Sequence, residues 1–293
     1  MPELPEVKNI SDILRNILIG NYFHGILINE KSRYAKENKE IKGEKYLEKE
    51  ITKNNDILYP SYGKFTDIYI KGKKIFFVIK LKNGEFIILF SFLSLHGTWR
   101  INEDIPYLKI TLLCSSRKNK LLYEKNLYFN DKSNFGTLEI LKTDLEYEYI
   151  LKDTGPDYLS GKINGEIFLE KLKEKKLKKK EIGVFLLEQQ HFSGVGAYIN
   201  SECLYKSKIS PFRLIEKLSD IEIYLLYDNI MEVMNESYKL GGHSFVDYVD
   251  PYGNNGSYKT EIHEHNIDSF GNKITKEKMK NNRNVFYVKN LQL

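Results

Sequence analysis

The sequence predicts an α+β fold, with an N-terminal β-sandwich and flanking helices, then a helical domain and a C-terminal β-hairpin. Short β-rich runs separated by glycines dominate the first half, and helical periodicity dominates residues 157–245. An apolar run, Val285–Val288, follows near the end. The turn-rich stretch Asp153–Asp157 separates the two halves. We therefore expect three domains, at residues 1–150, 157–245 and 250–293.

The composition indicates a basic, intracellular, globular protein. The 293 residues are 41% hydrophobic and 29% charged, and the formal net charge of +5 suits a polyanionic partner without requiring one. Only two cysteines occur, Cys114 and Cys203, which excludes a disulfide scaffold. No run reaches the roughly 18 apolar residues that a membrane helix needs, and the N-terminus does not resemble a secretion signal.

The first domain begins with a predicted amphipathic helix over residues 5–19, because apolar residues recur there at helical spacing and Gly20 follows. Strands are expected after it, and Asn83-Gly84 between two apolar runs predicts a β-hairpin. The expected strands are Tyr22–Asn29, Thr66–Lys71, Ile75–Leu81, Phe86–Ser91, Leu108–Cys114, Leu121–Phe129 and Thr137–Leu141.

The second part is predicted to be helical. The lysine-rich run Lys171–Lys180 fits a solvated helix face best, and a patch that steers DNA is the functional alternative. The expected helices are Ile167–Leu177, Glu181–Gln190, Ala197–Lys206 and Asp220–Leu240.

The first residues carry a candidate nucleophile. Removal of Met1 would expose the secondary amine of Pro2, beside the carboxyl group of Glu3. An α-amine has a reference pKa of about 7.7–8.0, so part of it is unprotonated at neutral pH. Such an amine can attack an aldehyde-like carbon and form an iminium, while the carboxyl group handles the proton. A proline that merely starts the chain is the simpler interpretation of this residue alone.

A second candidate site is the turn Gly194-Val195-Gly196 between two predicted helices. Unpaired amides of Gly194 and Gly196 at a helix N-terminus, together with the helix dipole, would suit a phosphate. A lone Gly-x-Gly more often marks a tight turn.

The hexapeptide Met1–Glu6 resembles the opening of the formamidopyrimidine-DNA glycosylase / endonuclease VIII family, and residues 188–211 resemble its helix–two-turn–helix (H2TH) motif. The resemblance implies that Pro2 is the nucleophile, that Glu3 is the proton donor and that Glu6 contacts the flipped base. It places the family's active-site lysine at Lys64, where phosphate contacts would position the sugar.

Two segments, Phe92–Gly97 and Asp131–Gly136, resemble the family's intercalation loops. Leu95 and Phe135 would then fill the hole that a flipped nucleotide leaves in the base stack, and core packing is the alternative for both. Asn134 is a candidate DNA contact. Several positions depart from the family pattern, since Ser133 and Asn134 replace two arginines, Phe92 replaces a histidine and Ala197 replaces an asparagine.

The C-terminus resembles the zincless-finger subset of endonuclease VIII-like enzymes. Family members usually hold this hairpin with four cysteines around zinc, which this chain lacks. Arg283 matches the finger arginine that grips DNA phosphate. His263 and His265 form a His-x-His pair, which is most simply a solvated pair on a polar strand. Packing of four apolar residues in place of the cysteines is expected to hold the hairpin, namely Ile267, Phe270, Val288 and Leu291.

The resemblance thus implies a monomeric DNA glycosylase with AP lyase activity that acts on oxidised bases in duplex or single-stranded DNA and needs no metal or organic cofactor. Two alternatives stay open at this point. One is a degenerate, non-catalytic damaged-DNA-binding protein of the same fold, suggested by Ser133, Asn134 and Ala197. The other is an unrelated basic RNA-binding or structural protein.

Overall fold

The computed structural model describes residues 1–29, 50–51, 57–102, 106–117, 124–141, 143–244 and 248–293. These residues pack as two compact units. The first contains Met1–Pro2, Glu6–Leu151 and Ser244–Gly256, and the second contains Glu3–Pro5, Lys152–His243 and Ser257–Leu293. The three-domain division expected from the sequence stays a prediction.

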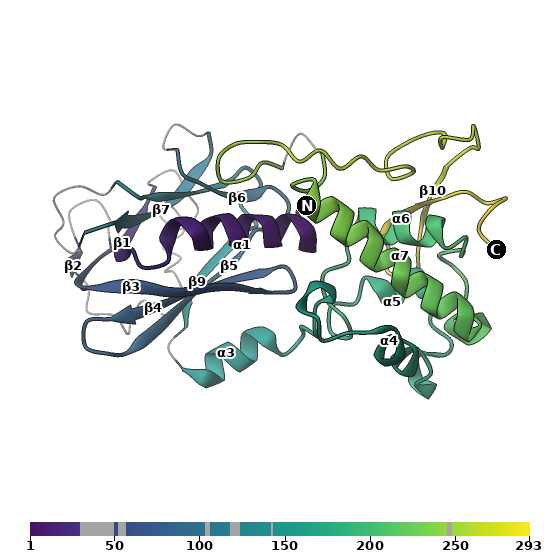
Figure 1. The fold of residues 1–293 in the computed structure, drawn as a ribbon, viewed down its shortest axis with the longest axis horizontal. Helices are drawn as coiled ribbons and strands as arrows, with labels where there is room; N and C mark the ends of the chain where they lie inside the picture. The colour runs from purple at the N-terminus through teal and green to yellow at the C-terminus, as the bar shows by residue number, and fades with distance from the viewer. Residues whose placement is uncertain (30–49, 52–56, 103–105, 118–123, 142, 245–247) are drawn as a thin grey trace. The chain divides into compact units, whose positions relative to one another are not determined.

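The first unit is built on one nine-stranded antiparallel sheet (Figure 1). Its strand order is β6-β8-β7-β1-β3-β4-β5-β9, with β2 paired to β3. The strands are β1 (Tyr22–Ile28), β2 (Glu50–Ile51), β3 (Ile57–Lys71), β4 (Lys74–Leu81), β5 (Phe86–Phe92), β6 (Gly97–Arg100), β7 (Leu108–Ser115), β8 (Leu127–Asp131) and β9 (Thr137–Leu141).

The two ends of this sheet share one core, as a sandwich requires. Trp99 lies on β6 at one end of the strand order, yet its ring meets the ring of Phe77 on β4 with centroids 5.5 Å apart. The Trp99 indole N–H donates to Ser91 Oγ on β5 at 3.0 Å. A buried indole N–H needs such a partner. The predicted α+β class is therefore confirmed.

Helix α1 (Leu4–Leu18) lies along the sheet (Figure 1). The apolar residues that recur at helical spacing, Val7, Ile10, Leu14 and Leu18, are all buried in the sandwich core. Pro5 is tolerated because the first amides of a helix have no intrahelical acceptor. The helix expected over residues 5–19 thus forms.

Strand β6 and helix α3 of the first unit escape the sequence patterns. Strand β6 is only four residues long, too short for a clear alternation. Helix α3 (Asp144–Leu151) has no buried residue, and Leu145 and Tyr149 on it are largely exposed, so it lacks the usual apolar stripe. Strand β8 overlaps the end of the predicted run 121–129 and continues to Asp131, while residues 121–123 lie outside the described part.

The second unit is helical, and aromatic rings fill much of its core. Phe168 contacts Phe185, Phe192 and Tyr227, with ring centroids 5.5–6.4 Å apart. Ser219 and Glu222 form a capping box at the start of the longest helix. The helices are α4 (Gly165–Leu172), α5 (Ile182–Leu186), α6 (Ala197–Lys206) and α7 (Asp220–Lys239), with short 3₁₀ turns η2 (Tyr158–Ser160), η3 (Lys175–Leu177) and η4 (Ile215–Lys217).

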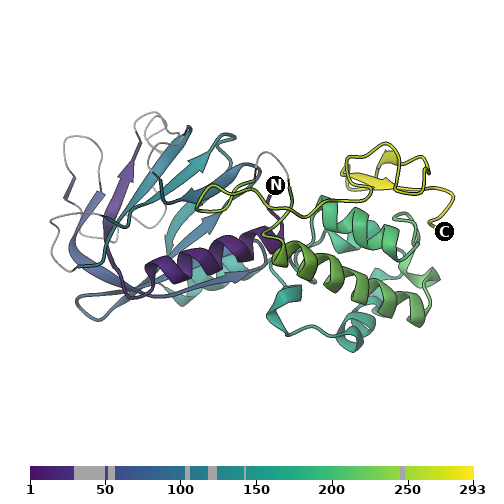
Figure 2. The ribbon, with the colours of Figure 1, turned by 45° about the horizontal axis from the view of Figure 1, so that its top comes forward.

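The second unit ends in a hairpin of β10 (Thr275–Lys278) and β11 (Asn284–Tyr287), which lies beside α6 (Figure 2). Its base packs through a small apolar core made of Tyr205, Ile262, Ile274, Phe286 and Val288, with Leu291 against it.

The expected packing of four apolar residues at the hairpin is therefore only half right. Val288 and Leu291 do pack, but Ile267 and Phe270 are 63% and 79% exposed. Asp268 orders their turn instead, because its carboxylate accepts the amides of Phe270 and Asn272 and the hydroxyl of Tyr205. The turn is held by polar contacts, so its apolar side chains need not be buried.

No helix in the described part of the chain is both long and apolar enough to cross a membrane.

Acid should weaken the second unit through two buried histidines. Burial lowers the pKa of His243 to about 4 and that of His263 to about 3. Unfolding restores a pKa near 6.5, so the unfolded chain binds more protons below that pH. We expect stability to fall as pH drops from about 6.5 towards 4, by at most about 1.4 kcal/mol per pH unit for each histidine.

Thermal melting between pH 7 and pH 4.5 measures this effect. The double variant His243→Gln/His263→Gln should show a flatter dependence on pH than the unaltered protein. His265→Gln is the matched control, because His265 is exposed. Identical pH dependence in the double variant and in the control would contradict the assignment.

Candidate active site

The N-terminus is anchored by the carboxylate of Glu3, which is 2% exposed. Glu3 Oε1 accepts the amide of Tyr198 at 2.9 Å, and Oε2 accepts the amide of Gly196. The Gly196 amide belongs to the N-cap residue of α6 and the Tyr198 amide to its first turn, where the helix dipole also stabilises a negative charge. Pro2, the predicted nucleophile, is buried next to this anchor in sequence.

The Gly194-Val195-Gly196 turn is shaped for this contact. A Cβ on Gly196 would lie 2.3 Å from Glu3 Cδ, and Gly194 has φ +118°, which side chains rarely adopt. Gln189 braces the turn, since its side chain donates to Val195 O and accepts from the Gly194 amide, both at 2.9 Å.

The expectation that these turn amides are unpaired is therefore wrong. The Gly196 amide binds Glu3 and the Gly194 amide binds Gln189. The sequence signal was ambiguous because a glycine turn at a helix N-terminus serves an internal carboxylate as well as a phosphate. Contact of Gly194 and Gly196 with DNA stays a prediction.

The two predicted intercalation loops lie at the same end of one strand pair. The first loop ends where β6 begins, the second begins where β8 ends, and Gly97 pairs with Asp131 across these strands. Leu95 and Phe135 are 41% and 61% exposed, so neither is a core residue. This arrangement brings the two predicted wedges onto neighbouring loops.

Asp131 shapes the second loop. Its buried carboxylate accepts the amide and hydroxyl of Ser133 at 3.0 and 2.8 Å and the amide of Gly136 at 2.7 Å. Asn134 takes the left-handed conformation, with φ +60°, at the tip. Sequence reasoning missed Asp131, although Asp followed by Ser and Asn is the signal of a turn closed by an aspartate side chain.

Lys64 and Glu6 both belong to the first unit, in different surroundings. Lys64 is exposed on β3, with its Nζ 5.9 Å from the centroid of the Tyr22 ring. Glu6 is 1% exposed. Its charge helps to raise the pKa of Tyr248, although burial is the larger cause.

Tyr248 also accepts a hydrogen bond from Asn9 Nδ2 at 3.1 Å. No local pattern could have revealed this neighbour of Glu6, because 239 residues separate Asn9 from Tyr248.

Arg283 is exposed on the loop of the β10–β11 hairpin, as its predicted contact with phosphate requires. The His-x-His pair is split, since His263 is buried against Phe286 and His265 is exposed. Burial of His263 was not expected. No group of three or more His, Cys, Asp or Glu side chains among the described residues is arranged to hold a metal ion.

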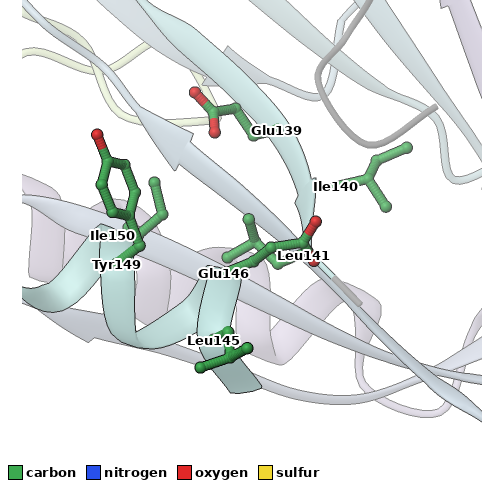
Figure 3. A pocket seen from close by; sticks show the side chains of 7 residues that line it. All are labelled: Glu139, Ile140, Leu141, Leu145, Glu146, Tyr149 and Ile150. Atoms are coloured by element: carbon green, nitrogen blue, oxygen red, sulfur yellow. The ribbon is translucent and has the colours of Figure 1, made fainter. Parts of the chain in front are cut away.

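A cavity of about 310 Å³ lies between β9 and α3 (Figure 3). It is lined mainly by apolar side chains, and no residue predicted for the active site lines it. The lining residues are Glu139, Ile140, Leu141, Leu145, Glu146, Tyr149 and Ile150.

Comparison with known proteins identifies the family. A family model described as the formamidopyrimidine-DNA glycosylase H2TH domain matches residues 154–248. The formamidopyrimidine-DNA glycosylase of Lactococcus lactis subsp. lactis (strain IL1403) is 30% identical over 264 residues, which cover 89% of this chain and 87% of that protein. The chain belongs to the formamidopyrimidine-DNA glycosylase family. The alternative of an unrelated RNA-binding or structural protein is therefore wrong.

Solved structures of the family agree with the fold. The structure of MutM in complex with carbocyclic 8-oxo-G containing DNA aligns with a TM-score of 0.77 and 26% identity over 99% of both chains. The complex of wild-type Lactococcus lactis Fpg (MutM) with an oxidized pyrimidine containing DNA gives the same TM-score, identity and coverage. Membership of the zincless-finger subset stays a prediction.

The Glu3 anchor predicts a stability loss in Glu3→Gln. Glutamine keeps the shape but offers one acceptor oxygen, so one of the amides of Gly196 and Tyr198 loses its partner. We expect a loss of about 1–3 kcal/mol in the free energy of unfolding, measured by urea denaturation. Glu166→Gln, at an exposed position in the first turn of α4, should change it by less than about 0.5 kcal/mol. Equal stability of both variants would argue against the anchor.

Proposed function

We propose that this chain is a bifunctional DNA glycosylase and AP lyase that removes oxidised bases through a Schiff base on Pro2. The observation that carries the proposal is the buried Pro2–Glu3 terminus, whose carboxylate is anchored on α6, in a chain of the formamidopyrimidine-DNA glycosylase family. Relatives were solved with DNA containing 8-oxo-G or an oxidised pyrimidine, which supports damaged DNA as the substrate. The protein acts as a monomer in this proposal.

The chemistry starts once Met1 is removed. The Pro2 nitrogen forms a bond with C1′ of the deoxyribose and gives its proton to the Glu3 carboxylate, while the C1′–base bond breaks and the base leaves as an anion that takes a proton from water. Glu3 then gives the proton it received to O4′ as the C1′–O4′ bond opens, which leaves an iminium between Pro2 and C1′. The Glu3 carboxylate so formed is stabilised by the amides of Gly196 and Tyr198 and offsets the positive charge of the iminium.

Strand cleavage follows from the iminium. Loss of a proton from C2′ expels the 3′ phosphate, and a second elimination, with loss of a proton from C4′, expels the 5′ phosphate. Water then releases the sugar fragment from Pro2. Lys64 and Arg283 bind the flanking phosphates, and Glu6 contacts the flipped base in this scheme.

A second candidate is a non-catalytic protein that binds damaged DNA. Ser133, Asn134 and Ala197 favour it, because the resemblance places two arginines and a phosphate-binding asparagine at these positions. Such a protein would have no use for a nucleophile with a carboxyl group beside it, so the catalytic proposal explains more of the sequence.

Reductive trapping decides between the two candidates. The protein is incubated with DNA that carries an abasic site or an oxidised base, and borohydride is added. The unaltered protein should form a covalent adduct on Pro2, located by mass spectrometry of the N-terminal peptide. Pro2→Gly, or a chain with an added N-terminal residue, should lose at least about 100-fold in strand cleavage while keeping DNA affinity within about 3-fold.

Mass spectrometry of the untreated protein provides the control, since retained Met1 would block the amine. DNA binding without an adduct, with Met1 removed, would favour the non-catalytic candidate. Undiminished cleavage by the N-terminally extended chain would refute the assignment of Pro2.

The wedge assignment predicts a difference between duplex and single-stranded substrates. Leu95→Ala/Phe135→Ala should slow base removal from duplex DNA by about 10-fold or more, because unstacking costs a few kcal/mol that the wedges partly offset. Removal of the same lesion from single-stranded DNA should change by less than about 3-fold, since there is less stacking to replace. Leu145→Ala, at an exposed position on α3, is the control. Equal slowing on both substrates would contradict the wedge role.

A further inference from the structure

The loop that carries Arg283 is tightly ordered within itself. The Met279 amide donates to Arg283 O at 3.0 Å, and the Asn282 amide donates to Met279 O at 2.9 Å. The Arg283 amide donates to Asn281 Oδ1 at 3.1 Å. A loop with these bonds moves largely as one piece, so whatever holds one end of it also fixes Arg283.

The Met279 side chain packs this loop against the helical part of the second unit. It is 3% exposed, whereas the four residues after it are exposed. Its Sδ occupies space beside Gly183 on α5, where a Cβ would lie 2.8 Å from the sulfur and 3.0 Å from Pro211 O. The glycine at position 183 thus leaves room for the Met279 side chain of the loop.

Lys280 adds a charged contact at the same place. Its Nζ lies 3.1 Å from Glu181 Oε1, and the Glu181 side chain is only 8% exposed. Among the described residues, Glu181 Oε2 is buried with no hydrogen-bond partner. The Lys280 side chain is 72% exposed, so it compensates the buried carboxylate from the solvent side, and loss of Lys280 would leave that buried charge uncompensated.

We propose that Glu181, Gly183, Met279 and Lys280 form a clamp that fixes the finger loop and positions Arg283 for DNA phosphate. Glu181 and Gly183 are positioning residues in this proposal, since they act on DNA only through the loop. The inference rests on the proposed function for the role of Arg283. It goes further by assigning a task to residues that neither the family motifs nor the sequence patterns singled out.

The clamp predicts that Glu181→Gln weakens DNA binding, which is the opposite of what the change in charge alone predicts. Glu181→Gln removes a negative charge and frees Lys280, so a role through charge alone would strengthen binding to a polyanion. A positioning role predicts weaker binding, because the loop loses its charged contact. We expect about a 5-fold loss of affinity for lesion-containing duplex. Gly183→Ala, which displaces Met279 without changing any charge, should give a similar loss.

A double-mutant cycle tests whether the loss passes through Arg283. Glu181→Gln and Gly183→Ala are each measured in the unaltered background and in Arg283→Ala. The cost should shrink to less than about 2-fold when Arg283 is absent, because nothing is left to position. Glu277→Gln, on β10 of the same hairpin, should cost less than about 2-fold in both backgrounds. Equal costs in the two backgrounds, or stronger binding by Glu181→Gln, would overturn the proposal.

A spin label tests the clamp without DNA. Cys114 and Cys203 are buried, so a cysteine placed at Asn284, exposed beside Arg283, can be labelled selectively. The label should be at least about 2-fold more mobile in Gly183→Ala than in the unaltered protein, and unchanged mobility would overturn the clamp. Trapping on Pro2 is read separately. If no adduct forms but the costs of Glu181→Gln and Gly183→Ala still shrink without Arg283, the proposed chemistry is wrong and the clamp stands. If an adduct forms but those costs are the same with and without Arg283, the clamp is wrong and the chemistry stands.

Discussion

The contact on which the candidate site depends is the one between the Glu3 carboxylate and the first turn of α6. A carboxylate that is 2% exposed would be costly to bury alone, and two backbone amides with the helix dipole make it tolerable. This contact fixes the residue next to Pro2, requires a residue without a side chain at Gly196, and takes up the amides that would otherwise be open to an anion. One interaction therefore explains how Glu3 is buried and why a glycine stands at position 196.

Buried or hydrogen-bonded acids that accept backbone amides recur in both units. Asp131 binds the amides of its loop, Glu202 accepts the amides of residues 261–263 below the hairpin, and Asp268 closes the turn before β10. Burial raises the pKa of Glu202, so the three amides at 2.8–3.0 Å compensate only part of its desolvation. A basic protein gains from this arrangement, since acids held by amides leave lysines and arginines for a polyanion.

Much of this could be predicted from the sequence, and the failures have physical reasons. The α1 stripe, the Asn83-Gly84 hairpin and the bounds of β9 and α6 follow from periodicity and turn chemistry, which are local. For Leu95 and Phe135 the sequence left two alternatives open, an exposed wedge or a core residue, because a single apolar residue in a loop is compatible with both. The partners of Glu3, Tyr248 and Glu181 lie 99–239 residues away along the chain, and no spacing encodes such contacts.

The hairpin shows how side chains can support a finger in a chain that has only two cysteines. The resemblance implies that family members usually tie this hairpin with zinc held by four cysteines, which would order it at a single point. Here its base is held by the apolar core around Phe286, by the bond from the Phe286 amide to Ser201 Oγ and by the bond from Tyr205 to Asp268. All three supports involve residues of α6, namely Ser201 or Tyr205. The loop at the other end of the hairpin is held by Met279 beside Gly183 of α5 and by Lys280 beside Glu181. A two-stranded hairpin alone is marginally stable in water. Support at both ends therefore offsets this marginal stability. In the proposed clamp it also makes the position of Arg283 depend on residues far from the loop in sequence.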